Sequence, residues 1–363
     1  MGSLTRLRAR AGARVYPWQQ GSRLRTGAAL LLLGLLLSVA PLGRAADGLI
    51  ATSGISTAVL SGAHYVEAAT FLGRYGLTHQ RLTPTRARFS SAWTKIELEA
   101  DKREMTLNGI RVFLGDPVVA HRKTLWVSRL DAEKLFGPLL KGDEYAGTAR
   151  RPRIIVVDAG HGGQDTGTRN AALKLDEKSF TLDVARRLAG ILESQGYKVV
   201  MTRTDDRYIG LKERAEIANR ANADLFVSVH FNSVEKSPQV RGSETYILTP
   251  RFQRSTSETK SSDDDRQLQP GNVGDPWNAV LGLQVQRHLL DQLETFDRGL
   301  KRARFAVLRL VECPAVLVEA GYLSNEQEAR KIATAEYRAA IAEAVANGIA
   351  AYDVQVTTAT ARR

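Results

Sequence analysis

The chain has 363 residues, 43% of them hydrophobic and 25% charged, which is the composition of a soluble globular protein and a length sufficient for about two domains. Lysine and arginine outnumber aspartate and glutamate by 51 to 39, which gives a formal net charge of +12. No basic patch interleaved with aromatic residues and no recognition-helix motif accompanies this charge, so nucleic acid is not an expected partner. The single cysteine, Cys313, excludes an internal disulfide.

The N-terminus has the pattern of a signal peptide over residues 1–46. Six arginines precede an apolar run at residues 28–40, and Gly43-Arg44-Ala45 places small residues at the two positions that a signal peptidase reads. Thirteen residues interrupted by Gly34 and Ser38 fall short of the ~20 needed to span a bilayer. We therefore expect an exported protein of the periplasm or cell envelope, without stable membrane association after cleavage. The long basic stretch leaves a twin-arginine-like signal, an anchor or a mis-assigned start as alternatives.

Removal of residues 1–46 changes the charge of the protein. That segment holds seven arginines and no acidic residue, so 44 basic residues remain against 39 acidic ones and the net charge falls to +5. A mildly basic protein suits an anionic polymer, although the same balance is common among soluble proteins.

Residues 55–140 are predicted to form a small α+β domain. Residues 65–75 have a helical pattern, residues 105–114 form two short strands about the Asn108-Gly109 turn, and residues 124–128 form another strand. A short capped helix is expected over residues 128–136. The stretches TLNGIRVFLGDPVV and TLWVSRLDAEKL resemble the small domain at the N-terminus of some copper amine oxidases, which is also attached to several envelope enzymes. The resemblance implies an accessory module and no copper site.

After a polar linker at residues 141–152, residues 153–353 alternate strand and helix. Short β-branched runs at residues 154–157, 197–201, 225–229 and 315–318 are typical of strands buried on both faces. Amphipathic helices are expected over residues 177–195, 211–222, 279–293 and 335–352. The pattern predicts an α/β domain with a mostly parallel sheet flanked by helices. Residues 250–277 are too polar to fold alone and are expected to form a long surface loop.

Three residues with metal-binding or acid-base chemistry follow buried strands of this domain. His161 comes shortly after the first strand, and His230 and Glu319 come at the ends of the third and fourth. The carboxyl ends of parallel strands meet at one edge of a sheet, so these side chains should project from the same rim. Two imidazoles and a carboxylate, with water in the fourth position, form a common catalytic zinc set.

Glu177 joins this group from the start of the helix at residues 177–195. Its spacing from Phe180, Val184 and Leu188 puts it on the face of the helix that turns toward the sheet. The alternative is that Glu177 only complements the helix dipole, with Asp176 as a possible cap. From the residues alone, that alternative is favoured.

The order of six motifs resembles the zinc-dependent N-acetylmuramoyl-L-alanine amidases of the type-3 family: VVDAGHGGQDTG, DEKSFTLDVARRL, YKVVMTR, LKERAEIAN, ADLFVSVHFNS and PAVLVEAGYLSN. The resemblance covers nearly all of residues 153–352. It implies zinc ligands at His161, Glu177 and His230 and a catalytic acid-base at Glu319. It further implies peptidoglycan as the substrate and hydrolysis of the amide between the lactyl group of N-acetylmuramic acid and L-alanine. Some relatives carry aspartate close to the metal where this chain has Asn232, so its metal affinity is open.

Two other functions compete with this interpretation. A wall-binding protein could keep the fold without the chemistry, and another zinc enzyme, such as a carboxypeptidase, could trim the stem peptide. Arg203 and Arg214 could bind substrate carboxylates, but structural salt bridges or solvated charges are the favoured roles for both.

Overall fold

The computed structural model describes residues 54–234 and 236–361. The expected signal peptide over residues 1–46 lies outside the described residues. Within the described ranges, none of the helices combines the length and the apolar character required to cross a bilayer.

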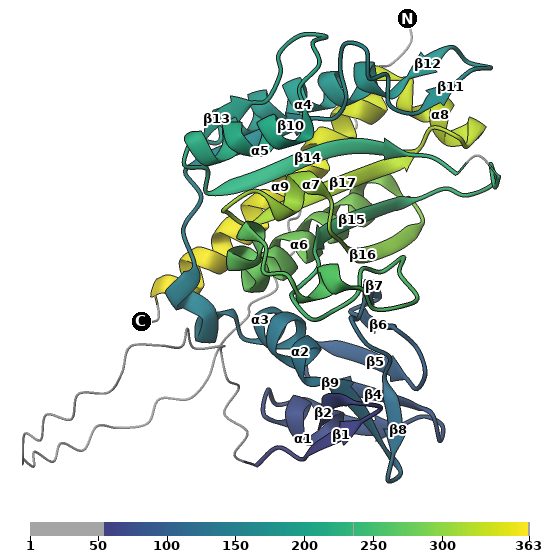
Figure 1. The fold of residues 1–363 in the computed structure, drawn as a ribbon, viewed down its shortest axis with the longest axis vertical. Coiled ribbons are helices and arrows are strands. Elements are labelled where there is room, and N and C mark those ends of the chain that lie inside the picture. The colour runs from purple at the N-terminus through teal and green to yellow at the C-terminus, as the bar shows by residue number, and fades with distance from the viewer. Residues whose placement is uncertain (1–53, 235, 362–363) are drawn as a thin grey trace, which may run out of the picture.

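The N-terminal part consists of short antiparallel strands and one small helix (Figure 1). The predicted strands around Asn108-Gly109 and at residues 124–128 are confirmed, but the helix expected at residues 65–75 begins later, at Ala68. Tyr65 and Val66 instead pair with Ser128 and Val127 in a strand, where their aromatic and β-branched side chains are favoured and both are buried, on opposite faces. The elements are β1 Thr57–Leu60, β2 Ala63–Glu67, α1 Ala68–Gly73, β3 Thr78–Arg81, β4 Arg86–Ser90, β5 Lys95–Glu99, β6 Glu104–Leu107, β7 Ile110–Phe113, β8 Val119–His121 and β9 Thr124–Ser128.

The capped helix predicted after β9 is present and extends further than expected. The Ser128 hydroxyl accepts a hydrogen bond from the Asp131 N–H at the start of α2 (Arg129–Asp131). The chain continues through a π-helical turn and α3 (Gly137–Leu140), and a 3-10 helix then occupies Gly142–Thr148.

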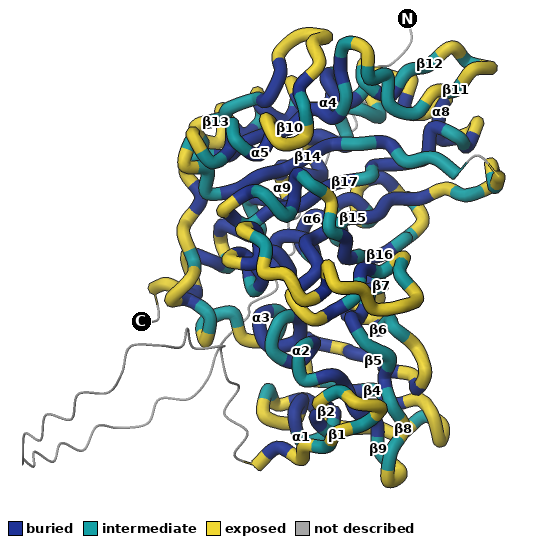
Figure 2. Tube along the Cα trace, in the orientation of Figure 1, coloured by how far each residue is buried: buried dark blue, intermediate teal, exposed yellow. Residues whose placement is uncertain are grey.

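The predicted parallel strands form one side of a large sheet. They are β10 (Ile154–Ala159), β13 (Lys198–Met201), β14 (Leu225–Asn232) and β17 (Ala315–Tyr322), and each neighbouring pair runs parallel in the order β13-β10-β14-β17. Figure 2 shows β10, β14 and β17 as the buried centre of the fold, with exposed residues concentrated in the loops. These three strands are covered on both faces, as their unbroken apolar runs predict. The same prediction is wrong for β13, because it is the edge strand of the sheet and its residues are exposed or half-buried.

Helices form a layer on each face of this sheet. Val157, Val227 and Val318 pack in one hydrophobic cluster with α4 (Glu177–Ser194), α6 (Asp275–Leu293) and α9 (Ala335–Ala361). Val156 and Phe226 point the other way, into a second cluster with α5 (Leu211–Arg220) and α7 (Ala306–Arg309). Successive strand residues thus alternate between two cores, which produces three layers.

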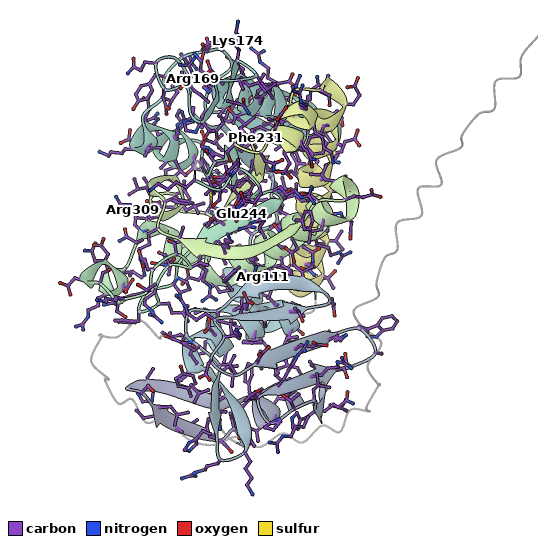
Figure 3. The ribbon with its side chains drawn as sticks, turned by 90° about the vertical axis from the view of Figure 1, so that its right-hand side faces the viewer. Arg111, Arg169, Lys174, Phe231, Glu244 and Arg309 are labelled. Carbon is purple, nitrogen blue, oxygen red and sulfur yellow. The ribbon has the colours of Figure 1, made fainter. Side chains whose placement is uncertain are left out.

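The sheet as a whole is mixed, and the expectation of a mostly parallel sheet is wrong. Next to β17 lies β15 (Ser243–Leu248), which runs antiparallel to it, followed by β16 (Asp297–Ala303). The segment between β14 and β15 is too short to carry the helical crossover that parallel strands require, so the chain reverses direction. β16 then pairs with β7 through Leu300 and Val112, and the sheet continues into the N-terminal strands as 11 strands in the order β13-β10-β14-β17-β15-β16-β7-β6-β5-β4-β3. In Figure 3, the labelled residues Phe231 on β14, Glu244 on β15 and Arg111 on β7 follow one another from top to bottom across this sheet.

The polar segment at residues 250–277 carries two 3-10 turns, Asp263–Arg266 and Pro270–Gly274, before α6 begins at Asp275. It lies against the N-terminal part. Arg103 donates hydrogen bonds to the carbonyls of Arg254, Ser255 and Glu258. The remaining elements are β11 (Arg169–Asn170), β12 (Leu175–Asp176) and α8 (Glu326–Ile332), and the Asn325 side chain caps α8.

Candidate metal centre

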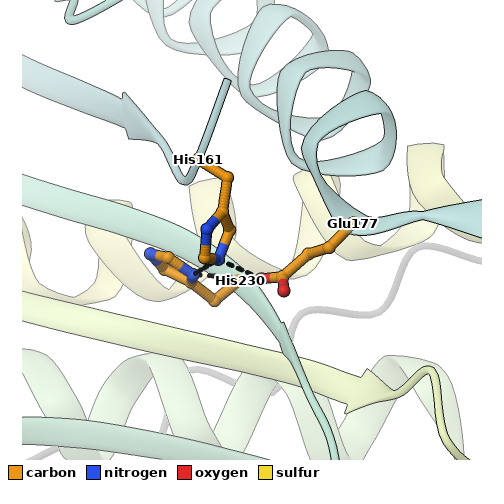
Figure 4. Close-up of side chains that lie close together, drawn as sticks. All are labelled: His161, Glu177 and His230. Carbon is orange, nitrogen blue, oxygen red and sulfur yellow. Dashed lines mark hydrogen bonds and ion pairs between the residues drawn. The ribbon is translucent and has the colours of Figure 1, made fainter. Parts of the chain in front are cut away.

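Three side chains from separate elements meet at the carboxyl edge of the parallel strands. His161 comes from the loop after β10, His230 from β14 and Glu177 from the first residue of α4. One ligand atom from each lies within 4.8 Å of the others, so the group could hold a metal ion (Figure 4). The structure brings together the three residues that the family resemblance implies as zinc ligands.

The Glu177 carboxylate forms the centre of the group. Its Oε1 lies 3.1 Å from His161 Nε2 and 3.0 Å from His230 Nδ1, and it accepts a hydrogen bond from the Phe231 N–H at 2.9 Å. Its Oε2 accepts from the Thr168 N–H at 2.9 Å. Burial acts to raise the pKa of Glu177, but the two imidazoles outweigh burial and hold the pKa well below its usual range. The alternative role of Glu177, as a partner of the helix dipole only, does not explain why its carboxylate contacts both His161 and His230.

Asp165 orients one of the histidines, and the sequence reasoning missed it. Its Oδ2 lies 2.9 Å from His161 Nδ1, and its Oδ1 accepts a hydrogen bond from the Gly167 N–H at 3.0 Å. With Nδ1 bound to a carboxylate, His161 presents Nε2 to the group, an arrangement typical of metal-binding histidines. Burial acts to lower the pKa of His161, but hydrogen bonds with Glu177 and Asp165 leave it raised. The signal in the sequence that could have identified Asp165 is its place four positions after His161.

Two glycines allow the backbone to approach the group closely. A Cβ added to Gly160 would lie 2.3 Å from His230 Cε1, and one added to Gly167 would lie 2.6 Å from Glu177 Oε2. Gly167 also has a positive φ of 64°. Larger residues at either position would displace a proposed ligand.

A buried ion pair supports the loop that carries His161. Arg214 Nη1 lies 2.7 Å from Asp158 Oδ1, and Nη2 donates to the His161 carbonyl at 2.7 Å. Thr202 and Ser228 donate hydroxyl hydrogen bonds to Asp158. Arg203 is likewise buried, and it donates to the carbonyls of Ala159 and Gly160. Arg214 therefore forms a structural salt bridge of the kind that was expected, whereas Arg203 supports the same loop through backbone carbonyls.

Glu319 lies beside this group on β17, in register with His230 on β14. Its Oε2 is buried and has no hydrogen-bond partner in the described part of the chain. Burial, and then the nearby carboxylates of Glu177 and Glu244, raise the pKa of Glu319 well above its usual range. It borders the same cavity of about 540 Å³ as the three metal-binding candidates.

Glu244 is a second carboxylate beside Glu319 that the sequence did not indicate. It is in register with Glu319 on β15 and forms a short ion pair with Lys301. The Asn232 amide donates to Glu244 Oε1 at 2.5 Å, and the Tyr322 hydroxyl donates to the same oxygen at 3.1 Å. The side-chain amide of Asn232 is therefore engaged by Glu244.

The segment that carries this site is similar to known proteins. A family model described as N-acetylmuramoyl-L-alanine amidase matches residues 155–351. Uncharacterized protein YqiI of Bacillus subtilis is 33% identical over 200 residues, which are 55% of this chain and 84% of that protein. N-acetylmuramoyl-L-alanine amidase AmiC of Escherichia coli O6:H1 is 32% identical over 244 residues, which are 61% of this chain and 58% of AmiC. A solved N-acetylmuramoyl-L-alanine amidase from Clostridium difficile 630 is 32% identical, with 56% of this chain and 97% of that chain covered and a TM-score of 0.46.

Proposed function

The chain belongs to the N-acetylmuramoyl-L-alanine amidase family, whose model spans more than half of its length, and from this premise we propose that it is a zinc-dependent hydrolase of peptidoglycan. The bond cleaved is the amide between N-acetylmuramic acid and L-alanine. The observation that carries the proposal is the convergence of His161, Glu177 and His230 within 4.8 Å, inside the segment that the family model matches.

The chemistry of these donors fits zinc. Two imidazole nitrogens and one carboxylate oxygen are a usual catalytic set, and Asp165 supplies the outer hydrogen bond that such a histidine requires. Zinc held by these three residues would supply a Lewis acid and would lower the pKa of a bound water to ~7. The side-chain amide of Asn232 donates a hydrogen bond to Glu244, which supports a set of three zinc ligands that does not include Asn232.

Glu319 is the proposed acid-base residue. The reaction forms a bond from a water oxygen to the lactyl carbonyl carbon and breaks the bond from that carbon to the alanine nitrogen. The water must lose a proton and the departing nitrogen must gain one, and one carboxyl group within reach of both can perform the two transfers. Burial, and then the carboxylates of Glu177 and Glu244, raise the pKa of Glu319, which makes its carboxylate a stronger base toward the water proton.

Two further features belong to the proposal. The arginine-rich, apolar N-terminal segment supports export to the periplasm or cell envelope, where peptidoglycan is accessible. Residues 55–140 are proposed as an accessory module, since the metal-binding candidates and Glu319 all lie outside them.

Mass analysis of the products released from purified peptidoglycan tests the proposal. The untreated protein should free intact stem peptides from the glycan, chelator treatment should abolish release, and added zinc should restore it. Shortened stem peptides would indicate a peptidase instead. Absence of any product from zinc-loaded protein would indicate a wall-binding protein without the chemistry.

A further inference from the structure

The rim of the metal-site cavity carries exposed aromatic side chains. Tyr208 is 48% exposed and Phe305 is 40% exposed, and both line the 540 Å³ cavity that contains His161 and Glu177. Leu211, also exposed, lies on the same rim. Large exposed apolar side chains gathered around a polar site are typical of ligand binding.

Both aromatic residues border packed parts of the fold. A Cβ added to Gly163 would lie 2.8 Å from the backbone nitrogen of Tyr208, so the backbone at Tyr208 packs directly on the loop that carries His161. The ring of Phe305 packs on the ring of Tyr246, with centroids 5.1 Å apart. A ring held in this way can bind a ligand with little loss of conformational entropy.

Arginine guanidinium groups cover two other exposed phenylalanine rings, Phe252 and Phe296, at 4.4 and 4.3 Å from the ring centroids. No such arginine contact is shown for Tyr208 or Phe305 within residues 54–234 and 236–361. Both rings line the cavity and are partly exposed, so part of each ring is accessible from the cavity.

The charges around the cavity indicate which part of the substrate these rings contact. The only arginine or lysine among its lining residues in the described ranges is Arg214, which is buried and paired with Asp158. Stem peptides carry carboxylates, and the described side chains that line the cavity offer them no unpaired arginine or lysine. The glycan is built of sugar rings with uncharged, apolar C–H faces, which pack well on aromatic side chains.

We propose that Tyr208 and Phe305 form a sugar-binding rim that holds the glycan strand of peptidoglycan against the metal site. The inference rests on the proposed function and adds a binding subsite to it: the glycan occupies the aromatic side of the cavity, and the stem peptide leaves on another side. Both residues are positioning residues for the substrate.

Binding of a peptide-free β-1,4-linked N-acetylglucosamine tetramer tests the rim without any bond cleavage. The full chain loaded with zinc is titrated with the tetramer and, separately, with free stem peptide. The variants are Tyr208→Ala, Phe305→Ala and their combination. Tyr208→Phe keeps the ring, and Phe252→Ala is the matched control, since Phe252 is 56% exposed but lies outside the cavity.

Loss of each ring should weaken tetramer binding by about 3- to 10-fold, and the double variant should lose more than either. The KM for peptidoglycan should rise with kcat unchanged, because the rim binds the substrate and the transition state alike. Phe252→Ala should match the wild type in both measurements, and Tyr208→Phe, which keeps the ring, should bind the tetramer more tightly than Tyr208→Ala.

The inference is overturned if the wild type does not bind the tetramer, if the alanine variants behave like Phe252→Ala, or if they lose affinity for the stem peptide instead. In each of these cases, wild-type amide hydrolysis would remain intact. Failure of the proposed function would appear differently, as a wild-type protein that releases no stem peptide.

Discussion

Replacement of Asp165 by asparagine should weaken zinc binding through the orientation of His161. The Asp165 Oδ2 lies 2.9 Å from His161 Nδ1, and the carboxylate accepts the N–H of that nitrogen when Nε2 faces a metal. Asparagine keeps an oxygen for the Gly167 N–H, which Asp165 Oδ1 accepts at 3.0 Å. Its amide nitrogen, however, places a donor opposite the donor on Nδ1. The substitution therefore removes the orienting bond while the turn is retained.

The magnitude follows from the exposure of Asp165. Loss of an outer carboxylate partner costs about 10- to 100-fold in metal affinity. The Asp165 side chain is 43% exposed, so water can replace part of the lost hydrogen bond. We therefore expect a loss near the lower limit, about 10-fold, which corresponds to ~1.4 kcal/mol.

Competition with a chromophoric chelator at neutral pH measures this affinity directly. Asp205→Asn is the matched control, because Asp205 is an exposed aspartate after β13 whose carboxylate pairs only loosely with Arg207, at 3.6 Å. The control should bind zinc like the wild type. Equal zinc affinity in Asp165→Asn and the wild type would refute the orienting role.

Two further predictions concern the support and the protonation of the site. Arg214→Met should lower the free energy of unfolding, measured in urea, by about 3–5 kcal/mol, because it leaves Asp158 buried without its cation. The control Arg220→Met, on the same helix, removes an exposed ion pair and should lower the free energy of unfolding by at most ~0.5 kcal/mol. Equal losses in the two variants would contradict the prediction. Zinc affinity should fall as the pH is lowered through the raised pKa of His161, because the protonated ring cannot coordinate, and the fall should begin at a higher pH than for a histidine of ordinary pKa 6.5. An affinity that is constant from about pH 8 to about pH 6 would contradict this expectation.

The sequence predicts the part of the site that depends on local strand pattern. Runs such as residues 225–229 identify buried parallel strands, and the rule that their carboxyl ends share an edge brings His161 and His230 together. The helical period also places Glu177 on the sheet-facing side of α4, although its pairing with both histidines appears only in the structure.

Features that depend on distant pairing were not predictable in this way. Glu244 lies on β15, whose place beside β17 is set by a chain reversal after β14 and not by an apolar run. The link from Leu300 to Val112 joins strands far apart in the chain and extends the sheet into the N-terminal part. Register between such strands depends on the packed core, for which the local sequence carries no signal.

The central claim is that three side chains hold zinc while Glu319 moves the proton. Glu319→Gln tests it most directly, because glutamine preserves the shape of the side chain and removes the base. Zinc content and the rate of stem-peptide release are measured on the same preparation. The account predicts zinc content equal to that of the wild type and a rate lower by about 100-fold or more. Retained activity would contradict the acid-base role, and joint loss of zinc and activity would make Glu319 a metal ligand instead.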